Sequence, residues 1–502
     1  MINIEIQKME SILNVLAYDP EQPMIFSSGI FLWLFLGFTF IYMLLQKKMT
    51  ARLVFVTLFS YFFYYKSSGI YFFLLAVVTV SDWLIGGQIG KILDRNPEDK
   101  GRARWLIALS VIIDLSLLAY FKYTNFFLGS ISEIIGNNFQ PLDIFLPVGI
   151  SFFTFQSLSY TIDIYRREIR PLPSLLDYAF FVSFFPQLVA GPIVKARDFV
   201  PQIRKPLQIT RRMFGMGVYL IVIGLFKKAV ISDYISINFV ERVFDQPDMF
   251  SGLEVLLGIY GYALQIYCDF SGYSDMAIGI ALLLGFRFPM NFNAPYKSVS
   301  VTDFWRRWHI SLSTWLRQYL YISLGGNRKG KLRMYLNLIT TMLLGGLWHG
   351  ASWNFILWGA LHGMALACHK FFSQEVLHHD RHYYSAGWRR IVAIVITFHF
   401  VCLCWIFFRC SDMETAVTMI SQVATNFHPE LLWQVISGYP WVFGLMAFGF
   451  ISHYLPDSWQ QRLVARLSKT NVIVCALLIT AVIYIVIQVK SSDIQPFIYF
   501  QF

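Results

Sequence analysis

Charged residues are scarce in this sequence. Only 14% of the 502 residues are Asp, Glu, Lys or Arg, whereas 56% are hydrophobic and 18% are aromatic. Soluble globular domains contain about 25% charged residues, and disordered chains are rich in charge and poor in aromatic side chains. The composition therefore excludes a soluble α/β enzyme and an intrinsically disordered chain, and it predicts a membrane protein.

Cysteine is also scarce, because the chain has six cysteines and no Cys-x-x-Cys spacing. This pattern predicts neither a disulfide framework nor a zinc knuckle. Lys and Arg outnumber Asp and Glu by 41 to 30, which gives a net charge of +11. The sequence lacks an Arg- and Lys-rich domain that could hold a duplex, so we expect no nucleic acid partner. We interpret the excess as the charge of cytoplasmic loops.

Long hydrophobic runs are what the sequence does have. A helix needs about 20 mostly apolar residues to cross a bilayer. The uncharged runs that meet this length are 22–46, 144–162, 391–408, 431–456 and 470–489. Other runs are shorter or interrupted, and they predict half-spans or helices buried inside the bundle. These runs are 53–65, 67–81, 105–121, 178–194, 213–226, 255–268 and 276–286.

The run 334–369 contains no Asp, Glu, Lys or Arg, and it is interrupted by Gly345-Gly346 and by Gly350. We expect two segments here, joined by a turn at membrane depth. Together the runs predict an all-α polytopic membrane protein with about 11 to 13 membrane segments, some of them re-entrant.

Basic residues follow several of the expected spans, and the segment 195–212 is strongly basic as well. Basic loops stay in the cytoplasm, which places the N-terminus outside. We therefore expect an extracytoplasmic segment over 1–24, a membrane core over 25–410, and further spans with a short interfacial helix over 411–502.

Polar groups within the expected membrane region concentrate between residues 268 and 362. Such groups are costly in a bilayer and usually face a cavity or a partner. His349 is the strongest candidate, because a neutral imidazole beside Trp348 can act as a base near neutral pH. Its neighbouring glycines would permit a broken helix and a close approach by substrate. The alternative is a core histidine bonded to a carbonyl group. His309 is the second candidate.

Several other polar residues have two interpretations. Asp269 and Ser271 either line a substrate path or hold helices together by internal hydrogen bonds. Arg306 either anchors the chain at the interface or binds an anionic group. His362 is expected to pack against Trp358, four residues earlier. The residues His378, His379, Asp380 and His382 have the composition of a metal site, but they fall in one loop without further ligands, and we expect no metal there.

Long motifs in this polar region resemble those of a known family. They include NFNAPYKSVSVTDFWRRWHISLSTWLRQYLYISLGGNRKG from Asn291 and GLWHGASWNFILWGALHG from Gly346. Over about residues 25–410 the chain resembles the membrane-bound O-acyltransferase family, in its bacterial polysaccharide-modifying branch. The resemblance implies a bundle around a central tunnel, with His349 as the catalytic residue and His309 as the second active-site histidine. We expect the remaining tunnel residues to be Trp305, Trp308, Trp348, Asn293, Asp269, Ser271 and Arg306.

The same resemblance implies a function. An acetyl group would move from a cytoplasmic donor, acetyl-CoA or another acyl thioester, across the bacterial inner membrane to an exported polysaccharide, with no bound cofactor. Alginate is the first choice of acceptor, and cellulose or peptidoglycan are alternatives. The implied partners are membrane lipid, an extracytoplasmic SGNH-type acetyltransferase and a polysaccharide synthase complex. Two other classes remain open: a transporter or flippase for polymer precursors, which inverted repeats would favour, and a structural scaffold for a polymer synthase.

Overall fold

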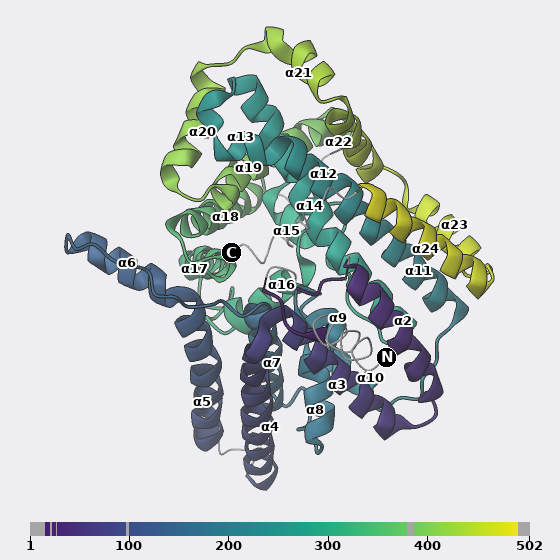
Figure 1. Ribbon diagram of the computed structural model, residues 1–502. Helices are drawn as coiled ribbons and strands as arrows, with labels where there is room; N and C mark the ends of the chain where they lie inside the picture. Colours follow the sequence, from purple (N-terminus) through teal and green to yellow (C-terminus); the bar gives the residue numbers. More distant parts are fainter. Residues whose placement is uncertain (1–15, 21–22, 27, 97–99, 379–385, 490–502) are drawn as a thin grey trace. The chain divides into compact units, whose positions relative to one another are not determined.

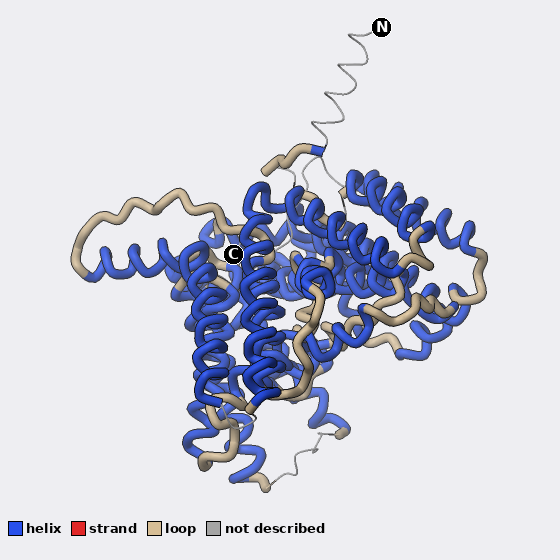
Figure 2. Tube along the Cα trace, turned by 90° about the horizontal axis from the view of Figure 1, so that it is seen from below, coloured by secondary structure: helices blue, strands red, loops and turns tan. Residues whose placement is uncertain are grey.

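The computed structural model describes residues 16–20, 23–26, 28–96, 100–378 and 386–489. These residues form helices joined by loops, and none of them lies in a β-strand (Figure 2). The prediction of an all-α protein is confirmed. By its contacts the chain divides into two compact units, one of residues 1–208 with 285–287 and the other of residues 209–284 with 288–502. The expected division at residues 24 and 410 stays a prediction.

The helices of the first unit are connected by short turns and by the loop that follows α6. They are α2 (Gly29–Leu44), α3 (Met49–Ser68), α4 (Phe72–Arg95), α5 (Lys100–Leu118), α6 (Thr124–Ile134), α7 (Ile150–Tyr165), α8 (Leu175–Ser183), α9 (Phe185–Leu188) and α10 (Ala196–Ile203). Helices α4, α5 and α7 lie side by side (Figure 1). Asp82 of α4 is fully buried there and accepts hydrogen bonds from Ser110 and Ser157, so the three helices are joined by polar as well as apolar contacts.

The helices of the second unit carry all of the sequence motifs that contain the candidate site. They are α11 (Arg211–Leu225), α12 (Asp233–Ile235), α13 (Glu241–Asp245), α14 (Gly252–Leu283), α15 (Val301–Arg307), α16 (Ile310–Trp315), α17 (Lys331–His349), α18 (Trp353–Phe371), α19 (Gly387–Arg409), α20 (Met413–Thr425), α21 (Leu432–Gly438), α22 (Pro440–His453), α23 (Asp457–Leu467) and α24 (Val472–Val489). A helix is present where the interfacial helix was expected, as α23.

Helix α14 is one continuous helix of 32 residues, although two separate segments were expected at 255–268 and 276–286. The polar residues between them do not break the helix, because Asp269 and Asp275 form ion pairs with lysines of the π-helical turn Phe226–Ser232 that follows α11. A charged side chain that has an ion-pair partner can stay buried, so the helix need not break to bring the charge to water.

Helices α17 and α18 form the two segments expected within 334–369, but the break lies only at residues 350–352. Helix α17 runs through Gly345 and Gly346 without interruption. A Cβ atom on Gly346 would lie 2.2 Å from the carbonyl oxygen of Phe355, and one on Gly350 would lie 2.0 Å from the ring of Phe355. These glycines allow the two helices to pack closely, and the expected close approach by substrate stays a prediction.

Five helices in the described part of the chain are long and apolar enough to cross a membrane, or six if the bent pair Pro429–Gly438 and Pro440–His453 counts as one span. This number is below the expected 11 to 13 segments. Two reasons account for it: several expected runs form helices shorter than 18 residues, such as α2 and α7, and others are continuous with their neighbours. The chain is a multi-pass membrane protein.

Candidate active site

Two histidines from separate motifs lie together in the second unit. His309 is fully buried and precedes α16, and His349 is 3% exposed and ends α17. The centroids of their rings are 6.5 Å apart. Forty residues separate them in the sequence, so the fold brings together the two residues that sequence analysis selected. Their chemical roles stay a prediction.

His309 has an uncommon backbone conformation, with φ 42° and ψ 55°. This left-handed region is unfavourable for residues with a side chain, and it is often found at functional sites. The backbone amide of Ile310 donates to the carbonyl oxygen of Asn291 at 2.9 Å, and Nδ1 of His309 lies 3.2 Å from Oδ1 of Asn291. Asn291 therefore holds both the turn and the ring.

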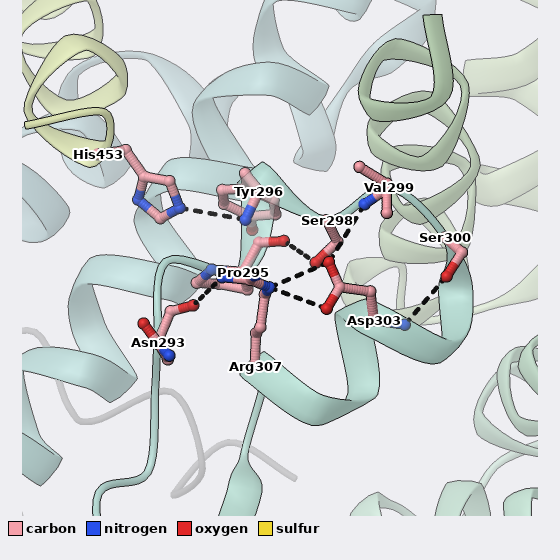
Figure 3. A network of polar contacts seen from close by, with 9 residues as sticks. All are labelled: Asn293, Pro295, Tyr296, Ser298, Val299, Ser300, Asp303, Arg307 and His453. Carbon is pink, nitrogen blue, oxygen red and sulfur yellow. Dashed lines mark hydrogen bonds and ion pairs between the residues drawn. The ribbon is translucent and has the colours of Figure 1, made fainter. Parts of the chain in front are cut away.

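Sequence analysis selected Asn293 and missed Asn291. Asn293 is exposed, and its N–H donates to the carbonyl oxygen of Arg307 at 2.9 Å. The guanidinium group of Arg307 also donates to the carbonyl oxygen of Asn293 at 3.3 Å (Figure 3). Arg307 in turn forms an ion pair with Asp303 at 3.1 Å within α15. The two asparagines are two positions apart in an Asn-Phe-Asn sequence, and in an irregular loop no periodicity indicates which of them faces inward. Arg306 is exposed on α15 and keeps both of its interpretations.

Aromatic rings surround His349. The ring centroids of Trp348, Trp358 and Phe408 lie 5.0, 5.0 and 5.2 Å from that of His349, and all three approach it edge to face. Trp358 comes from α18 and Phe408 from α19. An aromatic surface of this kind excludes water from the groups that it surrounds. Neither Trp358 nor Phe408 was selected from the sequence, because each belongs to an ordinary apolar run.

The three expected tryptophans occupy different places. Trp348 is next to both histidines, since its ring also lies 6.1 Å from that of His309. Trp308 packs against Trp405 of α19 at 5.0 Å. Trp305 lies in α15, three residues before Trp308, and its Nε1 donates to Nδ1 of His362 at 3.3 Å.

His362 packs against Trp358 with ring centroids 4.8 Å apart, which confirms the expected contact four residues apart. The break at residues 350–352 means that His349 and His362 do not belong to one helix. Trp358 contacts both of these histidine rings.

Asp269 belongs to a buried ion cluster. Its Oδ1 lies 2.5 Å from Nζ of Lys228, and the same nitrogen lies 2.8 Å from Asp233. Six residues further along α14, Asp275 pairs with Lys227 at 2.8 Å. These contacts favour the helix-holding interpretation of Asp269. Ser271 is fully buried on the same helix.

The remaining metal candidates give no cluster in the described residues, where no group of three or more His, Cys, Asp or Glu side chains is placed to hold an ion. His379, Asp380 and His382 lie outside the described residues. The site thus consists of two imidazoles. The buried side-chain amide of Asn291 contacts that of His309, and aromatic rings surround that of His349. Such a pair can move a proton and donate hydrogen bonds in a dry environment.

Comparison with known proteins gives consistent matches over this region. Residues 146–411 match the model of the membrane-bound O-acyltransferase family. A probable alginate O-acetylase of Pseudomonas aeruginosa is 44% identical over 79% of this chain and 74% of its own length. One of Pseudomonas putida is 37% identical over 95% of this chain and 100% of its own length. A peptidoglycan O-acetyltransferase of Helicobacter pylori is 39% identical over 79% of each chain.

Proposed function

We propose, because this chain belongs to the membrane-bound O-acyltransferase family, that it moves an acetyl group from a thioester donor on the cytoplasmic side of a bacterial inner membrane for the O-acetylation of an exported polysaccharide. Acyl transfer is the activity of the family. The donor that we propose is acetyl-CoA, and the membrane is the bacterial inner membrane. The observation that carries it is the pair formed by His309 and His349 inside an aromatic, water-excluding surface.

The two histidines supply what this reaction needs. A hydroxyl group attacks the carbonyl carbon of the thioester, its proton goes to an imidazole, and the carbon–sulfur bond breaks to release the thiol. Base catalysis of this kind contributes about 10²- to 10⁴-fold in rate. Trp348 and Trp358 keep water from competing with the hydroxyl group.

Alginate is the acceptor that we propose first, because relatives with 37 to 44% identity are named for it. Peptidoglycan is the second candidate, and the Helicobacter pylori relative favours it with 39% identity. Cellulose remains the third. We further propose that a separate extracytoplasmic SGNH-type acetyltransferase completes transfer to the polymer beside a polysaccharide synthase.

The test is the polymer-bound acetyl ester of cells that produce the wild-type protein, His349→Ala or His309→Ala, with the amount of each protein in the membrane matched by immunoblot. We expect the amount of polymer-bound acetyl ester to fall about 100-fold or more in both variants. His428→Ala is the control, because His428 is exposed and belongs to a surface pair with Glu430. Unchanged ester in both histidine variants at equal protein level would favour a transporter or a scaffold. Chemical analysis of the acetylated polymer identifies the acceptor.

A further inference from the structure

A cleft of about 520 Å³ lies in the second unit, where α11 begins and where the chain passes from α23 to α24. Both α23 and α24 pack against α11 (Figure 1). The volume is within the range of ligand pockets, about 300 to 1,000 Å³. Neither His309 nor His349 lines the cleft, so it is separate from the candidate active site. Its polar lining residues are Thr210, Arg211, Ser468, Lys469, Thr470 and Asn471.

The wall between α11 and the turn after α23 is built on a close backbone contact. A Cβ atom on Gly215 would lie 2.6 Å from the backbone nitrogen of Ser468 and 2.9 Å from its Cα. Only glycine permits this approach. The hydroxyl groups of Ser468 and Thr470 donate to carbonyl oxygens of α23, at 2.7 and 2.9 Å. The turn is thus held in place from both sides, and the cleft exists before any ligand enters.

Two other lining residues keep hydrogen-bond donors for a ligand. The side-chain oxygens of Thr210 and Asn471 accept backbone N–H groups of α11 and α24, at 3.1 and 2.8 Å. A hydroxyl group that accepts retains its hydrogen, and a side-chain amide that accepts through its oxygen retains the N–H groups of its nitrogen. The hydroxyl of Thr210 and Nδ2 of Asn471 can therefore donate into the cleft.

The charge of the lining is positive. Arg211 and Lys469 line the cleft, and no Asp or Glu is among its lining residues. Both cations are exposed, and within the described ranges neither forms an ion pair with a carboxylate. Helices α11 and α24 also begin here, and the N-terminal ends of helices carry partial positive charge. Two cations together with neutral donors are the chemistry that recognises a phosphate group.

The surroundings of the cleft are apolar on one side. Residues Arg211–Asp245 form one of the helical stretches that are long and apolar enough to cross a membrane, and the cleft lies at its first residue. On α24, Ile473 and Leu477 are 69% and 64% exposed, and on α23, Trp459 and Leu463 are 59% and 46% exposed. Exposed apolar side chains of a membrane protein contact lipid. The cleft therefore lies where polar headgroups meet acyl chains.

We propose that this cleft binds the phosphate headgroup of an anionic phospholipid, with the acyl chains along the exposed apolar side chains of α24. Arg211 and Lys469 contact the phosphate, and Thr210 and Asn471 donate to its oxygens. The basic segment 195–212 leads into α11 and assigns the cleft to the cytoplasmic leaflet, whose anionic lipids attract basic residues. A soluble phosphate compound would use the cations but not the apolar surface beside them. Binding here does not depend on acyl transfer.

The experiment measures the unfolding temperature of the detergent-solubilised protein as dioctanoyl phosphatidylglycerol is added. A ligand that binds the folded state raises this temperature until the site is saturated, and we expect this result for the wild-type protein. Two other probes are added at the same concentrations. Dioctanoyl phosphatidylcholine has the same chains and phosphate but no net charge, and inorganic phosphate has no chains. We expect neither of them to raise the unfolding temperature.

The variant that tests the site is Arg211→Gln with Lys469→Gln. We expect the midpoint of the phosphatidylglycerol titration to move to roughly 10- to 30-fold higher concentration. The unfolding temperature without lipid should stay that of wild type, because both side chains are exposed. The matched control is Arg462→Gln with Arg466→Gln, which removes the same charge from exposed positions of α23 outside the cleft. It should keep the wild-type midpoint.

Each other outcome overturns the proposal in a different way. An unchanged midpoint in the Arg211 and Lys469 variant shows that lipid does not bind at this cleft. An equal shift in both double variants indicates a basic surface without a defined site. Stabilisation by phosphatidylcholine excludes the need for a negative charge, and stabilisation by inorganic phosphate shows a site for free anions. All of these readouts are unfolding temperatures, so they are independent of whether the proposed acyl transfer is correct.

Discussion

Lys228 lies between two buried carboxylates. The lysine is 3% exposed, Asp269 is 2% exposed, and Nζ lies 2.5 and 2.8 Å from Asp269 and Asp233. Removing one partner of a buried ion pair leaves an uncompensated charge, which costs about 3 to 5 kcal/mol. This penalty is large against the total stability of a protein, about 5 to 15 kcal/mol.

We therefore expect Lys228→Met to lower the unfolding temperature of the detergent-solubilised protein and its amount in the membrane. The control is Lys331→Met, which removes a 71% exposed lysine that pairs with Glu375 at the surface, and it should leave the unfolding temperature as it is. The double variant Lys228→Met with Asp269→Asn should recover part of the loss, because one of the two stranded charges is gone. Equal unfolding temperatures for Lys228→Met and wild type would show that the buried cluster contributes no stability.

At the residue scale, the sequence predicted the two candidate histidines but not the residues that contact them. His309 and His349 were selected because a histidine in an apolar run is costly and the motifs around it are specific. Asn291, Trp358 and Phe408 were missed because their importance arises from contacts with residues far along the chain. An asparagine in a loop and an aromatic ring in an apolar run carry no local signal that distinguishes them from their neighbours.

Helices α11 and α14 pack through two pairs of glycines. A Cβ on Gly224 would lie 2.6 Å from the carbonyl oxygen of Gly272, and one on Gly279 would lie 2.8 Å from that of Gly217. The positions increase along one helix as they decrease along the other, so the helices are antiparallel. Close backbone approach between small residues is a common way to join helices in membranes. Here it also brings the turn Phe226–Ser232, with its two lysines, against Asp269 and Asp275.

We expect Gly224→Ala to destabilise the protein by about 1 to 3 kcal/mol, because the added methyl group meets backbone atoms that cannot move aside. Thermal unfolding in detergent measures this change. Gly444→Ala in α22 is the control, since a Cβ there meets nothing within 4 Å. It should be neutral or stabilising, by roughly 0.5 to 1 kcal/mol, because alanine is the better helix former. The prediction fails if the two variants unfold at the same temperature.

At the element scale, composition predicted where helices occur but not where they end. The run 334–369 was correctly divided into two helices, yet its glycines at 345 and 346 proved to be packing positions and not a break. The division of α14 was wrong because its aspartates have lysine partners from another segment. In a membrane helix, a glycine or a charged residue can mark either a break in the helix or a contact with another helix. Only the residue that it contacts on the neighbouring segment shows which of the two applies.

Within the second unit, residues of the C-terminal part of the chain form hydrogen bonds with the loop that leads to the site. His453, the last residue of α22, accepts a hydrogen bond at Nε2 from the backbone amide of Tyr296 at 3.1 Å (Figure 3). The hydroxyl of Tyr454 donates to the carbonyl oxygen of the same Tyr296 at 3.4 Å. Tyr296 lies in the loop that also contains Asn291, so residues beyond 411 hold the support of His309 although sequence analysis placed them outside the membrane core.

We expect His453→Ala to lower acetyl transfer several-fold at equal protein level, because the buried amide of Tyr296 loses its acceptor at a cost of about 1 to 3 kcal/mol and the loop moves. His453→Gln retains an acceptor oxygen and should recover most of the activity. The measurement is transfer from labelled acetyl-CoA in inside-out vesicles, with His428→Ala, an exposed histidine of the same C-terminal part, as control. If His453→Ala transfers acetyl groups at the wild-type rate, the helices after residue 411 support the fold independently of the site, and the boundary expected at residue 410 also divides the function.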